Sequence, residues 1–292
     1  MVAGVVWALC AAVCMGTATV LQALGARRAA TRDDGRGRGR TVVEVLRGWP
    51  FLAGAGLDTV GFAAQVVALR LVPLFLVEAA VAASLAVTAV VGTLVLGLRL
   101  RRAEWGAVAV VCLGLATLAV SAGRTGDGHG DAGLRVAVLV ASVLVVADGW
   151  AVGGRLRRGR AVVLGAAAGL GFGLTAIAVR LLSDATVPAI LAQPSAYAVV
   201  VSGLGGYLLL VQALQSGSVT AATAAMVICE TVWPGVFGVV WLGDSTRDGY
   251  GWLAVIGFVG CVGGGVALAR FGEAGESGGT VESGGEGGAA AR

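Results

Sequence analysis

Residues Ala221–Leu242 read AATAAMVICETVWPGVFGVVWL and carry one ionisable side chain, that of Glu230, near their middle. A helix of about 20 residues, rising ~1.5 Å per residue, matches the hydrocarbon thickness of a bilayer. Pro234 has no N–H, so the Glu230 carbonyl loses its helical hydrogen bond and a kink is expected. We therefore predict a membrane-spanning helix with a carboxylate and a freed carbonyl on one turn.

An ionisable group at this depth needs a physical reason to be there. It costs about 2.5–3.5 kcal/mol at a helix centre on the insertion scale. Free polar groups within lipid persist only against protein or a water-filled cavity. A polar solute pathway past Glu230 is the functional interpretation. The alternative is a carboxyl that stays protonated or bonds to a Ser or Thr of a neighbouring helix.

The overall composition is that of a membrane protein. Of 292 residues, 57 % are hydrophobic and 13 % are charged, whereas about a quarter are charged in an average soluble domain. Every basic residue is arginine, and the arginines cluster between apolar stretches, so the net charge of +4 does not predict nucleic-acid binding. The five cysteines lie within apolar stretches without metal-ligand spacing, so we expect no disulfide and no cofactor.

Nine apolar stretches predict an all-α, polytopic membrane protein with nine transmembrane helices. They cover residues 5–24, 50–69, 73–98, 105–121, 135–153, 162–182, 189–214, 221–242 and 250–269. The organisation that follows is a first transmembrane helix (1–25), an Arg/Gly-rich cytoplasmic loop (26–48), the rest of a first repeat (49–154), a second repeat (155–270) and a tail (271–292). The tail has too little apolar surface to fold, so we expect it to be disordered and cytoplasmic.

The distribution of arginine predicts the orientation. Most arginines fall in loops on one side of the predicted bundle, and the other side holds only Arg70, Arg124, Arg135, Arg180 and Arg247. By the positive-inside rule the N-terminus is outside the cell membrane and the C-terminus is cytoplasmic. The tryptophans at 49, 105 and 252 fall near span ends, where interfacial anchors belong.

Polar and small residues in the spans indicate which helix faces matter. Gly54, Asp58, Gly61 and Gln65 share one face of their helix, where glycines allow close approach and the other two add polarity. Glu78 lies roughly 8 Å into its span, and the sequence leaves open whether it lines a pathway or sits at a hydrated rim. Glycines at four-residue intervals in residues 165–173, and small residues at 257, 261 and 265, predict close helix packing.

The two halves of the chain are alike. VVWALCAAVCMGTATVLQ (5–22) aligns without a gap on VVLGAAAGLGFGLTAIAV (162–179), and later segments align in the same order. Spans 1, 3 and 4 thereby correspond to spans 6, 8 and 9. Because five spans separate equivalents, one unit points the opposite way from the other, which makes an inverted repeat of five plus four spans. Inverted repeats are typical of alternating-access transporters with a site near the midplane.

Four stretches carry a family resemblance: GTATVLQALGARR (16–28), GWPFLAGAGLDTVGFAAQVVAL (48–69), LVPLFLVEAAVAASLAVTAVVGTLVLGLRLRRAEWGAV (71–108) and LLVQALQSGSVTAATAAMVICETVWPGVFGVVWLGD (209–244). The chain resembles the drug/metabolite transporter (EamA-like) superfamily, and within it the branch of NIPA-type magnesium transporters. The resemblance implies that the third and eighth helices line a central cavity, with roles for Glu78, Thr88, Glu230 and Pro234. The chain departs from the family pattern in two ways. Glu78 stands where relatives often have proline, and a tenth span is absent.

The reading we favour is a transporter that moves a small solute by alternating access. Asp58 and Glu230 are the candidate groups for a cation or a coupling proton, with Gln65 and Gln212 along the same pathway. A hard divalent cation such as Mg²⁺ is the alternative substrate. It requires oxygen ligands, for which Asp58, Glu230, the freed carbonyl and Thr231 form a minimal set. An organic solute would instead have an amine fixed by a carboxylate.

Two other classes of protein are alternatives to a transporter. A membrane-embedded enzyme would need a nucleophile or base and phosphate-binding groups within the spans, but the single histidine, His129, is in a loop and the arginines are at span ends. We therefore expect no enzyme activity. A non-transporting scaffold or subunit predicts mutually satisfied carboxylates and no cavity. The expected partners are the bilayer and a small-molecule or cation substrate, and the sequence leaves a homodimer open.

Overall fold

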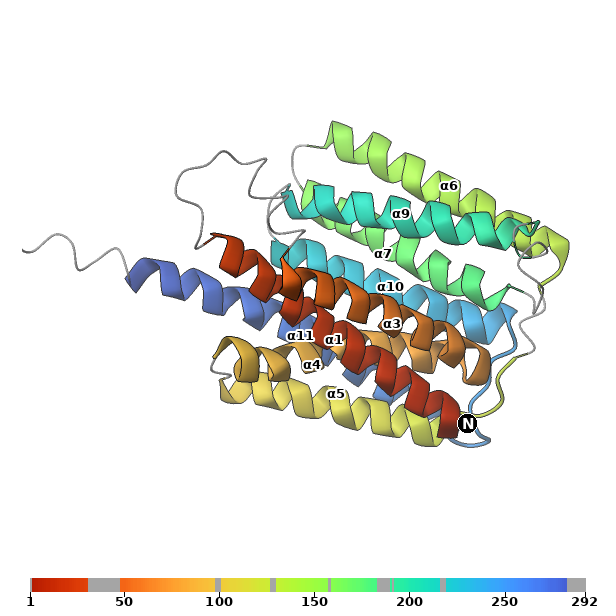
Figure 1. Ribbon diagram of the computed structural model, residues 1–292. Helices are drawn as coiled ribbons and strands as arrows, with labels where there is room; N and C mark the ends of the chain where they lie inside the picture. The colour runs from red at the N-terminus through yellow and green to blue at the C-terminus, as the bar shows by residue number, and fades with distance from the viewer. Residues whose placement is uncertain are drawn as a thin grey trace, which may run out of the picture.

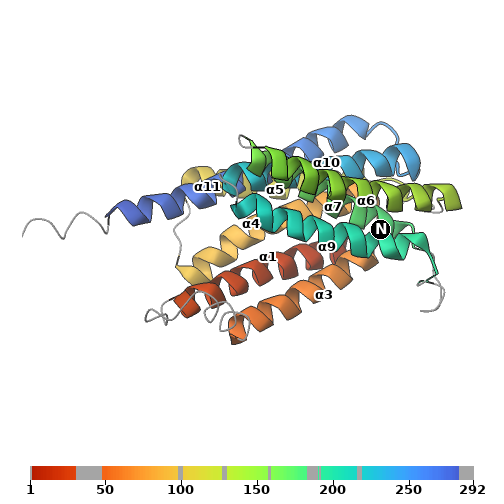
Figure 2. The ribbon, with the colours of Figure 1, turned by 90° about the horizontal axis from the view of Figure 1, so that it is seen from above.

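The computed structural model describes residues 2–30, 48–97, 101–126, 130–156, 159–182, 190, 192–215 and 219–282. Within these ranges the only strand-like pairing is a bridge between Ala122 and Thr246. The helices of the described part are α1 (Val2–Ala30), α3 (Trp49–Leu71), α4 (Leu74–Leu96), α5 (Arg102–Ser121), α6 (Ala132–Arg155), α7 (Arg160–Arg180), α9 (Pro194–Gln215), α10 (Val219–Trp241) and α11 (Gly251–Glu282). They run along one common direction (Figures 1 and 2).

In the described part of the chain, nine helices are long and apolar enough to cross a membrane. This confirms the predicted polytopic all-α class; the helices lie within a few residues of the predicted spans, except that α9 begins at Pro194, five residues after the predicted start. Large hydrophobic side chains are exposed along the flanks of the bundle, as lipid-facing surfaces require. Trp49, Trp105 and Trp252 are all exposed and lie in the first turns of α3, α5 and α11. Their placement agrees with the predicted interfacial anchors.

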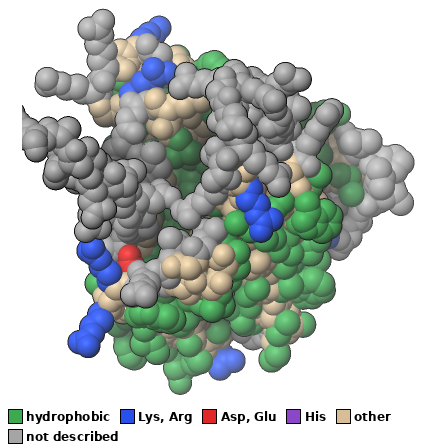
Figure 3. Space-filling model, turned by 60° about the vertical axis from the view of Figure 1, so that its left-hand side comes forward, with side chains coloured by type: hydrophobic (Ala, Val, Ile, Leu, Met, Phe, Trp, Pro, Cys, Tyr) green, Lys and Arg blue, Asp and Glu red, His purple; other side chains and the backbone are tan. Residues whose placement is uncertain are grey.

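The bundle has two ends that differ in chemistry. At one end the turn after α3, the loop after α5 and the ends of α7 and α10 meet around Arg180, and the N-terminal part of α1 packs there through Gly4 against Leu71 and Val72. We call this the Arg180 end. At the opposite, arginine-rich end lie Arg101, Arg102, Arg155 and Arg160. Figure 3 brings this second end forward and shows arginines beside a largely hydrophobic flank.

The glycine repeat of α7 packs against α10, as predicted. A Cβ on Gly165 or Gly169 would collide with the backbone carbonyls of Ala222 or Met226. One on Gly173 would lie 2.7 Å from Cγ of Pro234 and 3.4 Å from the carbonyl oxygen of Glu230. The helix α10 continues through Pro234, and the freed Glu230 carbonyl lies beside the α7 backbone. Close approach of α7 therefore covers that carbonyl with protein rather than with lipid.

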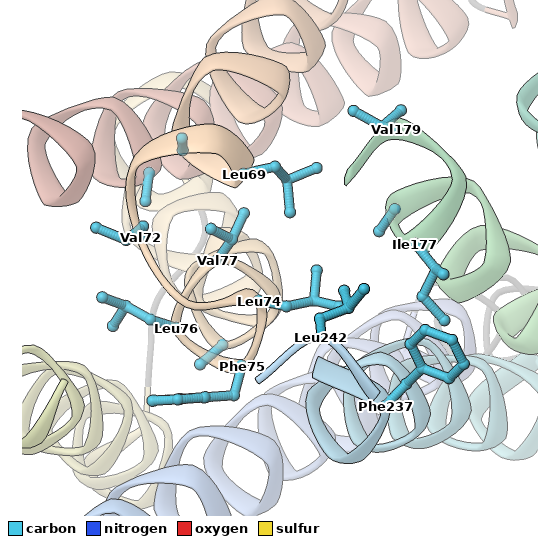
Figure 4. Close-up of a cluster of buried hydrophobic side chains, with 14 of the residues drawn as sticks. Leu69, Val72, Leu74, Phe75, Leu76, Val77, Ile177, Val179, Phe237 and Leu242 are labelled. Atoms are coloured by element: carbon cyan, nitrogen blue, oxygen red, sulfur yellow. The ribbon is translucent and has the colours of Figure 1, made fainter. Parts of the chain in front are cut away.

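The hydrophobic core is joined at one end of the bundle and divided at the other. At the Arg180 end, Leu69, Val72, Leu74, Ile177 and Phe237 belong to one cluster that connects α3, α4, α7 and α10 (Figure 4). Toward the arginine-rich end, two separate clusters take over. One lies among α4, α5 and α11, and the other among α7, α9 and α10. At the Arg180 end the shared core therefore packs between the two groups of helices.

Two terminal segments differ from the expected boundaries. The helix α1 continues to Ala30, past the predicted limit at residue 25, and residues 31–47 of the predicted loop lie outside the described residues. The helix α11 continues to Glu282, so residues 271–282 are helical where disorder was expected. Adding a residue to an existing helix gains one hydrogen bond without a new nucleation cost. Residues 283–292 lie outside the described part.

Candidate solute cavity

A cavity of about 610 Å³ lies among α1, α3, α4, α7, α9 and α10. Its size is within the range of roughly 300–1,000 Å³ that is usual for small-molecule sites. Most of its lining is apolar, including Phe62, Phe172, Met15 and Met226. The polar lining side chains are Thr19, Asp58, Thr59, Gln65, Ser84, Thr175, Glu230 and Thr231.

The two acidic lining residues lie near the middle of helices that are long enough to span a membrane. From Glu230 to the end of α10 at Trp241 the helix rises roughly 16 Å at ~1.5 Å per residue. From Asp58 to the end of α3 at Leu71 it rises roughly 20 Å. Both ends belong to the Arg180 side, and the hydrocarbon core is about 30 Å thick. The structure thus brings together, on opposite halves of the chain, two carboxylates that the sequence singled out separately.

No residue of the described part neutralises either carboxyl group. Of the described residues, none forms an ion pair with Asp58 or Glu230 or donates a hydrogen bond to their carboxylate oxygens. No arginine is among the described lining residues. Two described arginines adjoin lining residues in the sequence: Arg70, next to Leu69, is exposed, and Arg180, next to Val179, is already paired with Asp244. The cavity therefore holds two acidic groups and no described basic side chain beside them.

The hydroxyl groups of the lining also present acceptors. Thr231 donates its hydroxyl proton to the Val227 carbonyl at 2.7 Å, and Thr59 donates to Ala55 at 2.9 Å. Thr19 likewise donates to the Met15 carbonyl at 3.0 Å. Each hydroxyl has a single proton, so these groups face the cavity with oxygen lone pairs. The polar part of the lining is consequently rich in acceptors.

The exposed lining residues lie away from the Arg180 end. Leu69 and Val179, the lining residues nearest that end, are 1 % and 3 % exposed. Thr19, Asp58 and Thr59 are exposed and lie farther along their helices toward the arginine-rich end. The cavity is accordingly sealed by packed side chains at the Arg180 end.

Glu78 is not a lining residue, and it is not hydrated either. Its side chain is 1 % exposed, and its Oε1 atom has no hydrogen-bond partner. It lies one turn before the lining residue Ala82 on α4 and interacts electrostatically with Glu230. The helices of the shared core pack over this position, so Glu78 is buried inside the protein.

The other predicted pathway residues divide into two groups. Asp58, Gln65, Glu230 and Thr231 line the cavity together. The remaining three lie elsewhere. Thr88 donates to the carbonyls of Gly16 at 3.1 Å and Ser84 at 2.9 Å, which joins α4 to α1. Pro234 packs against Gly173, and Gln212 is half-buried on α9 outside the described lining.

Sequence reasoning missed a buried ion pair at the Arg180 end. Arg180 Nη2 lies 3.1 Å from Asp244 Oδ1, and the two side chains are 3 % and 0 % exposed. Arg180 also donates to the carbonyls of Val72 at 3.1 Å and Gly126 at 3.2 Å. Asp244 accepts from the backbone N–H groups of Gly126 at 2.8 Å and Leu74 at 2.6 Å. The pair therefore ties together the α3–α4 turn, the α5–α6 loop and the ends of α7 and α10.

A short antiparallel pairing reinforces this junction. Gly123 N donates to the Ser245 carbonyl, Ser245 N to the Arg124 carbonyl and Arg247 N to the Ser121 carbonyl, all at 2.9–3.0 Å. Gly126 packs so closely on the Leu242 carbonyl that no side chain would fit between them. The loops after α5 and α10, one from each half, are thus joined backbone to backbone.

No protein-family model, curated protein or solved structure matches the chain. Across the described residues, no group of three or more His, Cys, Asp or Glu side chains is placed to hold a metal ion. The cysteines of the described part are all free.

Proposed function

We propose that the protein is a membrane transporter that moves a small solute by alternating access. The observation that carries this proposal is the cavity with Asp58 and Glu230 at mid-membrane depth, one carboxylate from each half. Such groups are costly in a membrane and mark solute or ion pathways. The charge distribution of the loops supports an N-terminus outside the cell membrane and a cytoplasmic C-terminus.

The helix packing supports the inverted repeat on which this mechanism depends. In the first half α1 packs against α3 and α4, and in the second half α7 packs against α9 and α10. The alignment of the two halves makes the α1–α4 and α7–α10 pairs equivalent, and the α1–α3 and α7–α9 pairs follow the same order along the chain. In addition α5 packs against α11 and α4 against α10, so that predicted equivalents meet each other. A two-fold relation between repeats predicts this pattern.

The alternatives fit the cavity less well. A scaffold predicts satisfied carboxylates and solid packing, whereas Asp58 and Glu230 border an open volume and have no partner among the described residues. A divalent cation remains the second candidate, since Asp58, Glu230 and Thr231 share the lining. Two carboxylates are few for a hard cation that takes six oxygen ligands, and the ion would have to keep most of its waters.

The experiment that tests transport is uptake and efflux with purified protein in sealed proteoliposomes, comparing Mg²⁺ with a panel of amines. Asp58→Asn and Glu230→Gln are run beside the parent protein. We expect protein-dependent flux that both substitutions reduce. If no solute moves, the transport proposal fails. If solutes move equally well with both variants, the site is assigned wrongly.

A further inference from the structure

We propose that the substrate is an organic cation, and that Asp58 and Glu230 bind its positive charge from opposite halves of the protein. This inference rests on the proposed transport function and specifies its substrate class. It is carried by the composition of the lining: two acidic groups from opposite halves, no arginine among the described lining residues, and no described protein partner for either acidic group. A negatively charged cavity within low-dielectric walls attracts cations and repels anions.

The hydrogen-bonding character of the lining points the same way. Thr19, Thr59 and Thr231 use their hydroxyl protons on carbonyls of their own helices, so they offer acceptors to a solute. An anion needs donors, and a cation or an amine N–H needs acceptors. Of the polar lining groups described above, only Gln65 and Ser84 have protons that no protein hydrogen bond engages.

The size and the apolar lining favour an organic cation over a metal ion. Six waters around a hard divalent ion occupy roughly 180 Å³ at about 30 Å³ each. That is less than a third of the cavity of about 610 Å³. Phe62, Phe172, Met15 and Met226 would line the remaining space with apolar and aromatic surface. Aromatic faces and thioethers suit the carbon skeleton of an amine or quaternary ammonium ion.

The test measures binding and uptake of four probes: benzyltrimethylammonium, benzylsulfonate, phenylalanine and Mg²⁺. These present a cation, an anion, a zwitterion and a metal ion. Binding is measured on the purified protein in detergent, and uptake in proteoliposomes. The variants are Asp58→Asn, Glu230→Gln and the double variant. Asp148→Asn is the matched control, because Asp148 is a carboxylate within a span, on α6, that is exposed and does not line the cavity.

We expect benzyltrimethylammonium to bind and to be taken up, with affinity falling at least about tenfold in each single variant and disappearing in the double variant. Asp148→Asn should bind like the parent. Preferred uptake of benzylsulfonate, phenylalanine or Mg²⁺ would overturn the substrate class and leave transport standing. Carboxylate-dependent binding of the cation without uptake of any probe would leave the cation site standing and overturn transport. A normal elution profile in size-exclusion chromatography verifies that each variant is folded.

A separate observation, the junction at the Arg180 end, carries a second inference. We infer that Arg180, Asp244 and the paired loops are the closed gate of the transporter, which must separate for a solute to pass. The junction lies between the cavity and this end of the bundle and joins both halves through Val72, Gly126 and the bridge at Ala122. Toward the other end, the core is divided between two groups of helices.

A reversible crosslink tests the gate. Ala122 and Thr246 are antiparallel bridge partners, a geometry that places Cα atoms about 4.5–5.5 Å apart, within the range for disulfides. In a variant whose five native cysteines are replaced, Ala122→Cys/Thr246→Cys is oxidised and assayed with the solute that the parent transports. We expect uptake to stop on oxidation and to return on reduction, while each single-cysteine variant is insensitive to oxidant. Full uptake by the oxidised protein would overturn the gate and leave transport itself unaffected.

Discussion

Replacing Asp244 by alanine should destabilise the protein strongly, because it leaves Arg180 buried without its partner. The Arg180 side chain is 3 % exposed and its only ion pair in the described structure is with Asp244. Breaking a buried pair by removing one partner typically costs about 3–5 kcal/mol. The substitution also removes the acceptor of the Leu74 and Gly126 N–H groups, so the upper part of that range is expected.

The assay is thermal unfolding of the purified protein in detergent, followed by circular dichroism. At about 2–4 °C per kcal/mol, the midpoint should fall by the order of 10 °C. The matched control is Asp148→Ala, which removes an exposed carboxylate and should change the unfolding free energy by no more than about 0.5 kcal/mol. Adding Arg180→Leu to Asp244→Ala should recover part of the loss, since the uncompensated charge disappears. Equal midpoints for Asp244→Ala and Asp148→Ala would refute this reasoning.

Two further substitutions test the packing around the cavity. Gly169→Leu should destabilise the protein by at least about 1–3 kcal/mol in the same assay, because its side chain meets the Met226 carbonyl on α10. The control is Gly106→Ala, because a Cβ at this position meets nothing within 4 Å. This control should be neutral or should stabilise the protein by about 0.5–1 kcal/mol. A Gly169→Leu protein as stable as Gly106→Ala would contradict the close contact of α7 and α10. Glu78→Met should raise the unfolding midpoint, since it replaces a buried carboxyl that has an unpartnered oxygen with an apolar side chain of similar length. A lowered midpoint would indicate that Glu78 makes a stabilising interaction.

The sequence predicted the spans well because their signal is local. A run of about 20 apolar residues is long enough to span the bilayer whatever surrounds it. The glycine repeats were equally informative, since a four-residue interval places small residues on one helix face, and Gly165, Gly169 and Gly173 do contact α10. Depth along a helix follows from counting residues, and this placed Asp58 and Glu230 near the membrane centre.

The parts that sequence reasoning missed depend on tertiary contacts. Glu78 was placed near a span end correctly, but its burial is set by helices that pack over it from elsewhere in the chain. Arg180 and Asp244 are 64 residues apart, and nothing local to either residue indicates the other. Their only signal was an arginine in the last turn of an apolar span and an aspartate just after another. The way α4 packs against α1 is also a tertiary feature, and it turns the Thr88 hydroxyl toward α1 instead of the cavity.

The central claim is that Asp58 and Glu230 face water inside the protein, and reaction with a hydrophilic thiol reagent tests it most directly. In a cysteine-free variant, Asp58→Cys and Glu230→Cys are compared with Val60→Cys and Val232→Cys, which are exposed positions on the same helices that do not line the cavity. A small, charged, membrane-impermeant methanethiosulfonate is added to proteoliposomes, and modification is followed by mass spectrometry. We predict rapid modification at positions 58 and 230 and slow modification at 60 and 232, where lipid excludes the reagent. Equal, slow reaction at all four positions would contradict the account.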